Sequence, residues 1–490
     1  MGGTAVSAAA RAARAAAAVV ILGSLPYWLP PAVVRLRVRI FARVNGEEGV
    51  PVPGPEVGAE AFERLYAHPA ANGRSRGAAL SDLFWYWLAP GPEVHQEHLE
   101  PGPRYDAVAR TTRRVLTAVR RQEWERIVRH RARDVLEPLT GGGTRAVRLR
   151  DLVMPLWVAV HHEVVFREPC PDDVRDLIVG NADDVVSALK CTGVRHMDRR
   201  DRLTRYLLGR VRAGDVPFEL PEGLSDHESA CYLQGTFFNT AVVQMSEATA
   251  HVLLAIATRP QVRERLRREP VDSAYLDHVI EETLRYYPLF GVAHRITTDA
   301  ITLDADDPQD ATPATKLPAG SVLLFDYARY HRGGVPDADR FDPDRWARPR
   351  PSDLRHIPFG VAANRPCPAR GIAPLTLRTA VEEVLKRFEP VSSARHDRSM
   401  PNRGPCLLVP RENPTRRRGR AVRLAAMRAR DRWEDVTRSL AQLAYGSWMV
   451  ADARRQRLCG SYFEPAAEPT SGTQGGGGAA RCPVAGEGGR

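Results

Sequence analysis

Lysine and paired cysteines are almost absent from this 490-residue chain. Its seven cysteines are scattered, and no Cys-x-x-Cys pair occurs. An odd number of isolated cysteines argues against a disulfide framework and against a structural zinc site, and it favours a reducing compartment. If cysteine takes part in chemistry here, it acts as a single residue.

The chain also lacks an uninterrupted apolar run of membrane-spanning length. Residues 15–34 come closest, but alanine is only weakly apolar, and Pro26, Pro30 and Pro31 are expected to interrupt a helix. Residues 35–40 alternate between charged and apolar side chains, as a surface strand or an interfacial segment does. Residues 1–48 are therefore expected to lie on a membrane surface or on the body of a cytoplasmic protein.

Acidic residues are outnumbered, and the formal net charge of +11 comes almost wholly from arginine. This excess fits a nucleic acid, an anionic membrane or an acidic protein equally well, and a general bias toward arginine also explains it. Hydrophobic residues make up 43% of the chain, enough to bury a sizeable core. No nucleic-acid partner is expected.

Between its two ends, the chain predicts one mainly helical domain, residues 49–411. Residues 49–55 are rich in proline and glycine and indicate a stiff hinge. Apolar residues recur at helical spacing from 56 to about 300, whereas short strand-like runs occur between 286 and 330. Residues 412–490 form an extension with a glycine-rich tail, expected to be disordered, and one amphipathic helix, whose apolar face carries Trp433, Val436, Leu440 and Leu443.

The most clearly marked helix begins at Ser225. Ser225 and Glu228 have the spacing of a capping box, and no proline follows before Pro260. A helix of this length is too long for a surface element and is suited to crossing a large domain.

Four short motifs follow this helix. Glu282-Thr-Leu-Arg285 places opposite charges one helical turn apart. A turn-rich coil then contains Asp339-Arg340-Phe341. After it come His356-Ile-Pro-Phe359-Gly360 and Asn364-Arg365-Pro-Cys367, which precede a last helix. Each motif alone is weak or moderate evidence, but their order and spacing are specific.

In this order, residues 226–411 resemble the carboxyl-terminal half of the cytochrome P450 family. Residues 56–225 resemble it only in being helical and of suitable length. The resemblance implies a mainly α fold with a small β region, with heme b (iron protoporphyrin IX) between the long helix and the Cys367 loop. Cys367 would be the axial thiolate, kept deprotonated by the start of a helix and by nearby amide donors. Thiolate donation to iron favours O–O cleavage.

The resemblance also implies roles for other side chains. Phe359 would lie in the cofactor loop, and three arginines would meet the heme propionates: Arg365, Arg295 and Arg113. Arg113 lies in an arginine-rich stretch, so a surface position is an equal alternative. Glu282, Arg285 and Arg340 would form a buried charge triad, and such a cluster is stable only when all its members are paired.

The cysteine loop departs from the family pattern. The distance from Phe359 to Cys367 is one residue longer than usual, and Ala363 and Ala369 replace two glycines. Pro374 falls inside the expected last helix.

The middle of the long helix departs as well. The family carries an acid and a threonine there to deliver protons during oxygen activation, and these places hold Val243 and Gln244. Asn239 and Thr240, one turn earlier, resemble a displaced amide–alcohol pair. An amide such as that of Gln244 forms hydrogen bonds but does not readily donate a proton.

The expected function is monooxygenation of a small lipophilic molecule, with dioxygen and with electrons from a ferredoxin and its reductase. No flavin or iron–sulfur motif is visible, so a separate donor is required. A basic face is expected near the cysteine loop, formed by Arg365, Arg370, Arg378, Lys386 and Arg387. It would suit an acidic electron donor, or it would simply be a solvated helix end. The altered helix leaves open peroxide-driven oxidation, isomerisation or dehydration at heme, and a non-catalytic heme-binding protein.

Overall fold

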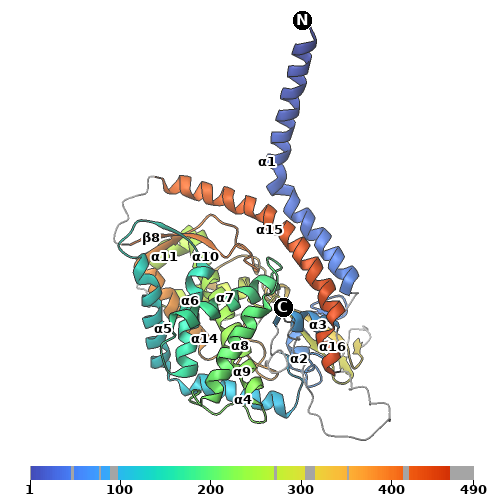
Figure 1. Cartoon of the computed structure of the whole chain (residues 1–490), viewed down its shortest axis with the longest axis vertical. Helices are drawn as coiled ribbons and strands as arrows, with labels where there is room; N and C mark the ends of the chain where they lie inside the picture. Colours follow the sequence, from blue (N-terminus) through green and yellow to red (C-terminus); the bar gives the residue numbers. More distant parts are fainter. Residues whose placement is uncertain are drawn as a thin grey trace, which may run out of the picture.

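The computed structural model is mainly helical and describes residues 2–45, 49–76, 79–88, 98–269, 273–303, 315–349, 353–411 and 419–463. Figure 1 shows the helices gathered into one body, from which α1 projects. The helices of the described residues are α1 (Gly2–Asn45), α2 (Phe62–Ala67), α3 (Ala79–Leu88), α4 (Pro103–Ala118), α5 (Arg121–Leu136), α6 (Leu149–Phe166), α7 (Asp172–Leu189), α8 (Met197–Arg212), α9 (Asp226–Leu233), the π-helical η3 (Gln234–Ala241), α10 (Val242–Thr258), α11 (Pro260–Arg268), α12 (Ala274–Tyr286), α13 (Tyr327–His331), α14 (Ala373–Arg387), α15 (Arg420–Gln456) and α16 (Leu458–Phe463), with 3-10 turns η2 (Glu137–Leu139) and η4 (Pro343–Ala347).

The strands of the described residues form three small sheets. The first has the order β1-β6-β3 and consists of β1 (Val50–Val52), β6 (Val322–Asp326) and β3 (Val292–Ile296), with β1 parallel and β3 antiparallel to β6. The second, antiparallel, has the order β2-β8-β7 and consists of β2 (Arg145–Arg148), β8 (Pro405–Pro410) and β7 (Phe388–Val391). The third pairs β4 (Ile301–Leu303) with β5 (Thr315–Leu317). The predicted fold class, mainly α with a small β region, is confirmed. The segment expected as a hinge instead supplies the edge strand β1.

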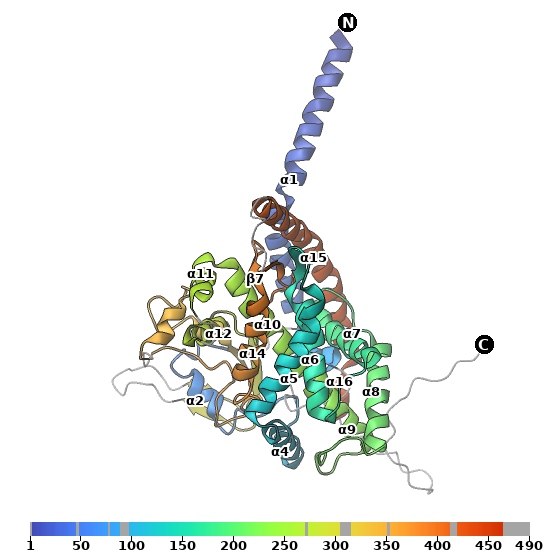
Figure 2. The same ribbon diagram turned by 90° about the vertical axis from the view of Figure 1, so that its left-hand side faces the viewer.

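The central helix runs without a break in α9, η3 and α10. The Ser225 hydroxyl accepts a hydrogen bond from the Glu228 amide, and the Glu228 carboxylate accepts one from the Ser225 amide, so the predicted capping box is present. In α10 the hydroxyls of Ser246 and Thr249 donate to carbonyls one turn earlier, at 2.6 and 2.7 Å, which satisfies these polar groups inside the core. Figure 2 shows α10 within the body, and α6, α14 and β7 pack around it.

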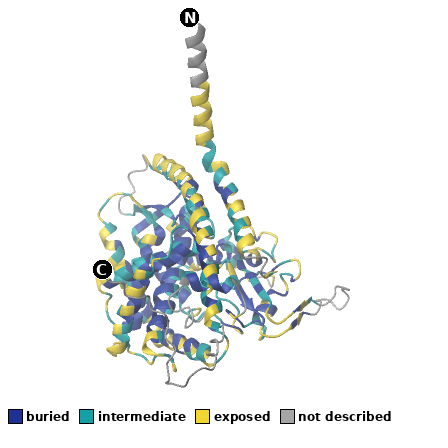
Figure 3. Ribbon diagram, turned by 45° about the vertical axis from the view of Figure 1, so that its right-hand side comes forward, coloured by how far each residue is buried: buried dark blue, intermediate teal, exposed yellow. Residues whose placement is uncertain are grey.

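Burial follows the same arrangement. Figure 3 shows the buried segments concentrated in the middle of the body, whereas residues 13–23 of α1 are exposed. By length and composition, two helices of the described residues could cross a membrane: Asp226–Thr258, with 78% of its apolar window buried, and Ala13–Val44, with 11% buried. The first is the core helix of the body.

The expectation of an interrupted amino-terminal segment is wrong. Pro26, Pro30 and Pro31 all lie inside α1, and the alternating residues 35–40 are helical too. A proline inside a helix removes one hydrogen bond and bends the axis, but it need not end the helix. Figure 1 shows α1 changing direction where it meets α15.

The carboxyl-terminal helix α15 packs on α1 and α3, and only part of the predicted face is buried, namely Val436. Trp433 and Leu440 are exposed. The buried face carries Val436, Gly446, Met449, Val450 and Ala453. A side chain at Gly446 would lie 2.8 Å from the Phe41 ring, so glycine permits the close approach of α1 and α15. The glycine-rich tail lies outside the described residues.

Candidate active site

Cys367 is half-buried in the loop that precedes α14. Its backbone amide donates a hydrogen bond to the carbonyl oxygen of Phe359 at 3.0 Å. This bond joins the two motif residues Phe359 and Cys367 and closes the lengthened loop between them. The chain turns at Gly360, where φ is 72°, and at Arg365, where φ is 49°. An arginine in the left-handed region costs free energy, and contacts of its side chain offset that cost. Arg365 Nε donates to the side-chain oxygen of Asn72.

The helix after Cys367 begins later than expected. α14 starts at Ala373, with Pro374 in its first turn, where proline is well tolerated because the first amides of a helix have no partner within it. Cys367 is therefore not at a helix start, and Pro374 does not interrupt the helix. The turn between them is held by the Arg370 amide, which donates to the Cys367 carbonyl at 3.2 Å.

A narrow cavity of about 180 Å³ separates the Cys367 loop from the central helix. Cys367 and Phe359 line it on the loop side, and Thr240, Gln244 and Met245 line it on the helix side. A slot with a thiol on one wall and a helix on the other has the form needed to hold a porphyrin between them.

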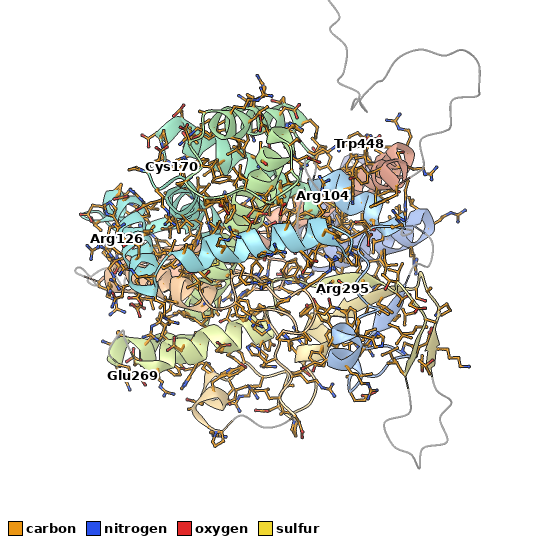
Figure 4. The ribbon with its side chains drawn as sticks, turned by 90° about the horizontal axis from the view of Figure 1, so that it is seen from below. Arg104, Arg126, Cys170, Glu269, Arg295 and Trp448 are labelled. Atoms are coloured by element: carbon orange, nitrogen blue, oxygen red, sulfur yellow. The ribbon has the colours of Figure 1, made fainter. Side chains whose placement is uncertain are left out.

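Arg295, which is labelled in Figure 4, lies on β3 and supplies a buried cation beside this cavity. Its side chain is 1% exposed, and its guanidinium lies 4.6 Å from the centre of the Tyr66 ring, which lines the cavity. Its Nε and Nη1 atoms have no hydrogen-bond partner among the described residues. A buried guanidinium needs an anion, so the position fits a porphyrin propionate.

Arg365 and Arg113 have different surroundings. Arg365 is buried, lines the cavity and lies 4.0 Å above the Tyr105 ring. Arg113, in contrast, is exposed on α4, whose inward face presents Thr112 and Leu116 to the cavity. Neighbouring positions on a helix point about 100° apart, so Arg113 faces away. The structure does not bring the predicted Arg113 to the site.

The predicted charge cluster is present with one member changed. Glu282 and Arg285 are completely buried, and their side chains pair at 2.8 Å. The second arginine is Arg345, whose Nε lies 3.2 Å from the Glu282 carboxylate. The Arg340 side chain is exposed, and only its carbonyl takes part, accepting from Arg285 Nη2 and Arg345 Nη2 at 3.1 Å each. The placement of Arg340 in the triad was wrong, because the coil turns its backbone inward and its side chain out.

The central helix changes its winding at the cavity. η3 is π-helical, a form that often occurs at functional sites. Asn239 is buried there, and its side-chain oxygen accepts a hydrogen bond from Asn181 Nδ2 of α7 at 2.5 Å. Asn239 therefore ties the helix to α7. Thr240 and Gln244 line the narrow cavity itself.

A second cavity of about 760 Å³ adjoins the first. The two share Thr240, Gln244, Leu289, Phe290 and Ala293. The larger cavity extends from these residues to α1, α3 and α7 and has a largely apolar wall.

The family model described as Cytochrome P450 matches residues 193–415, which contain the central helix, the Glu282–Arg285 pair and the Cys367 loop. The chain belongs to the cytochrome P450 superfamily. Members of this family bind heme iron and act as oxidoreductases on small molecules.

Curated relatives match in part of their length. The putative cytochrome P450 135B1 of Mycobacterium tuberculosis (strain ATCC 25618 / H37Rv) is 30% identical over 162 residues, 33% of this chain and 31% of the relative. The chain thus spans between about a third and about half of the length of the curated relatives that it matches. Among solved structures, a variant of cytochrome P450SP alpha has a TM-score of 0.58 and 17% identity, covering 72% of this chain and 88% of that one. A 6-coordinated cytochrome P450 from Thermus thermophilus has a TM-score of 0.55 and 17% identity, covering 71% and 90%.

Two polar residues of this P450 site were missed from the sequence. Glu247, one turn beyond Gln244, lines the larger cavity and is bound by Lys190 Nζ at 2.7 Å and by Arg150 Nη1 at 3.0 Å. Burial alone would raise the pKa of Glu247, but the charges of Lys190 and Arg150 hold it below its usual value. Burial lowers the pKa of Lys190 to about 8. The spacing of Gln244 and Glu247 was the available signal, since residues three apart share a helix face.

His161, on α6, is the other missed residue. It lines the narrow cavity, and neither ring nitrogen has a hydrogen-bond partner among the described residues. Burial lowers its pKa to about 4, so the imidazole is neutral at neutral pH.

The basic face expected beside the cysteine loop is largely neutralised. Arg365 is buried, Arg378 pairs with Asp277 and Glu382, and Lys386 and Arg387 pair with Glu383. Arg370 is exposed and has no ion pair within the described part of the chain. The five residues therefore do not form one free cationic surface.

Proposed function

We propose that this P450 holds heme b in the narrow cavity, with Cys367 as its axial thiolate ligand. The observation that carries the proposal is the slot between Cys367 and the central helix, with the buried, incompletely paired Arg295 beside it. Arg295 and Arg365 would bind the propionates, and Phe359 would lie against the cofactor within the loop. Heme bound there supplies oxidation chemistry, and a thiolate ligand favours O–O cleavage.

The proposed reaction is monooxygenation of a small lipophilic molecule with dioxygen. The larger cavity is of ligand size, has a mostly apolar wall and meets the heme cavity at Thr240 and Gln244. The sequence contains no flavin or iron–sulfur motif, so electrons would come from a ferredoxin and its reductase.

Proton supply is the step in which this chain departs from the family. Thr240 and Gln244 border both cavities and would hold a water or a polar group of the substrate in place. Neither side chain is an acid at neutral pH, and Asn239 is engaged by Asn181. The acid on the same stretch of helix is Glu247, held ionised by Lys190 and Arg150.

The test of the ligand is the reduced carbon monoxide spectrum of the wild type, of Cys367→Ser and of the matched control Cys170→Ser. Cys170 is half-buried and lies outside both cavities. We expect the strongly red-shifted Soret band of thiolate ligation in the wild type and the control, and its loss in Cys367→Ser. A band that survives Cys367→Ser would refute the proposed ligand.

A peroxide-driven reaction is the second candidate, because the two places of the family's acid and threonine hold Val243 and Gln244. Turnover with peroxide is compared with turnover on dioxygen, ferredoxin and reductase. If dioxygen is used, Val243→Asp with Gln244→Thr should raise the product formed per electron pair, since positioned acids contribute roughly 10²–10⁴-fold. If the wild type already forms about one product per electron pair on a hydrocarbon, the argument that Val243 and Gln244 deliver protons poorly is refuted. Thr240 would then be the candidate for proton delivery. Isomerisation or dehydration would need neither oxidant, and a heme protein with no turnover would be a binding protein.

For location, we propose a cytoplasmic protein with peripheral membrane contact through α1. The exposed apolar side chains on the outer part of α1 support this contact, among them Ile21, Leu22 and Trp28. Release by high salt and carbonate is expected, and retention through both washes would show a spanning helix instead.

A further inference from the structure

The wall of the larger cavity carries an excess of positive charge. Among the described residues, four cationic side chains line it, Arg37, Arg74, Lys190 and Arg398, against the single carboxylate of Glu247. Counting these five side chains with their ordinary charges, the wall has a surplus of three positive charges. A low-dielectric cavity of one sign attracts ligands of the opposite sign.

Three of these cations have other contacts. Lys190 pairs with Glu247, so their charges offset each other. Arg74 donates through Nη1 to the carbonyl of His294 at 2.5 Å. Arg37 belongs to α1 and lies 6.0 Å from the centre of the Phe41 ring. The remaining cation is Arg398.

Arg398 is half-buried and forms no ion pair among the described residues, and its neighbour Asp397 lies 3.7 Å from Arg395 instead. The two acids that act on it electrostatically are Asp326 and Asp397. Asp397 Oδ1 instead accepts from the Ser399 hydroxyl at 3.1 Å and from the Met400 amide at 2.8 Å. Asp326 Oδ1 accepts from the first turn of α13. Both acids are thus engaged in turns of the backbone, and burial lowers the pKa of Arg398.

The guanidinium of Arg398 rests on Gly291. A Cβ atom built at Gly291 would overlap the guanidinium, so the glycine leaves the space that it occupies. Gly291 directly follows Phe290, which lines both cavities. Arg398 therefore lies at the part of the large cavity next to the heme cavity, and α1 and α7 supply the wall at other points.

We propose that Arg398 binds the carboxylate of an anionic lipophilic substrate, whose apolar part fills the rest of the large cavity. The planar fork of a guanidinium matches a carboxylate with two parallel hydrogen bonds, and burial strengthens the pairing. The inference rests on the proposed function, because it takes the large cavity as the substrate site. It adds the substrate class and the residue that selects it.

The experiment measures binding to the ferric holoprotein by equilibrium dialysis and by the spin-state shift of the heme spectrum. The probes are straight-chain carboxylates from hexanoate to tetradecanoate, each paired with the primary alcohol of the same length. For the best-fitting length we expect the wild type to bind the carboxylate at least about tenfold more tightly than the alcohol, as a charge-assisted hydrogen bond allows. Arg398→Gln should remove this preference, and Arg398→Lys should keep part of it.

Two further variants test the position. Arg428→Gln is the matched control, because Arg428 is exposed, forms no ion pair among the described residues and lines neither cavity. It should keep the full preference for carboxylates. Gly291→Ala should weaken carboxylate binding without removing a charge, because it displaces the guanidinium.

Equal binding of acid and alcohol at every length, or a preference that survives Arg398→Gln, overturns the inference. Heme content and the carbon monoxide spectrum are measured on the same samples. A protein without thiolate-bound heme would refute the proposed function. Normal spectra without a preference for carboxylates would refute only the role of Arg398.

Discussion

Replacing Glu282 with alanine should be among the most damaging single changes in this P450. The carboxylate is completely buried and accepts hydrogen bonds from Nε and Nη2 of Arg285 at 2.9 and 2.8 Å. It also accepts from the Asp342 amide at 2.8 Å, from Trp346 Nε1 at 3.0 Å and from Arg345 Nε at 3.3 Å. One side chain thus joins α12 to the coil and to η4.

The magnitude follows from what the substitution leaves behind. Arg285 Nη1 still donates to the carbonyls of His331 and Ala338, at 2.9 and 2.8 Å, so its guanidinium stays buried. That charge loses its counterion, and breaking a buried pair in this way costs about 3–5 kcal/mol. The stranded donors of Asp342 and Trp346 add to the penalty, since an unsatisfied buried group costs roughly 1–3 kcal/mol. Since a domain is stabilised by only about 5–15 kcal/mol, most of its margin disappears.

The assay is the urea midpoint and the heme-to-protein ratio of three variants. Glu282→Ala should give apoprotein or aggregate, and Arg345→Ala should lower the midpoint, because Arg345 also pairs with Asp337 at 3.1 Å. Arg340→Ala should change stability by less than about 0.5 kcal/mol, because its side chain is exposed. A wild-type midpoint for Glu282→Ala would refute the reasoning. So would an Arg340→Ala variant as unstable as Arg345→Ala.

Three further predictions concern heme affinity, pH and the amino terminus. Arg295→Gln should speed heme transfer to apomyoglobin at least about tenfold, whereas Arg113→Gln should leave the rate unchanged, because Arg113 is exposed. Equal rates for the two variants would show that Arg295 does not bind the heme. Burial lowers the pKa of His162 to about 4. Below about pH 6.5 the unfolded chain therefore binds a proton at this residue that the folded chain does not bind, and the free energy of unfolding decreases as the pH is lowered toward 4. His162→Gln should therefore lose about 2 kcal/mol less than the wild type between about pH 7 and pH 5, measured by urea unfolding, and parallel curves would contradict this. Deletion of residues 2–28 should keep the melting temperature, because Pro30 is the first buried residue in the described part of α1. Deletion through Asn45 should lower it by removing Phe41 from the cavity wall, and the reverse order would show that the outer part of α1 supports the fold.

The sequence by itself determined the features that depend on local spacing. The capping box at Ser225 is a contact between residues three apart, and it forms as predicted. The Glu282–Arg285 pair has the same spacing and lies on one face of α12. Strands between 286 and 330 followed from short apolar runs, and the order of the motifs was sufficient to indicate the family.

Only the tertiary structure decided which arginines turn inward. Arg340 lies in a coil and Arg345 in the short turn η4 that follows it, and the sequence around them has no periodicity. Nothing local therefore shows that only the backbone of Arg340 reaches Arg285, whereas the side chain of Arg345 meets Glu282. Arg113 is one position from the inward-facing Thr112, and the rotation of α4 is set by its packing on the body. Arg398 became a candidate because folding brings it against Gly291, more than a hundred residues away. Side-chain direction in coils and the rotation of a helix depend on long-range packing, which a pattern of neighbouring residues does not contain.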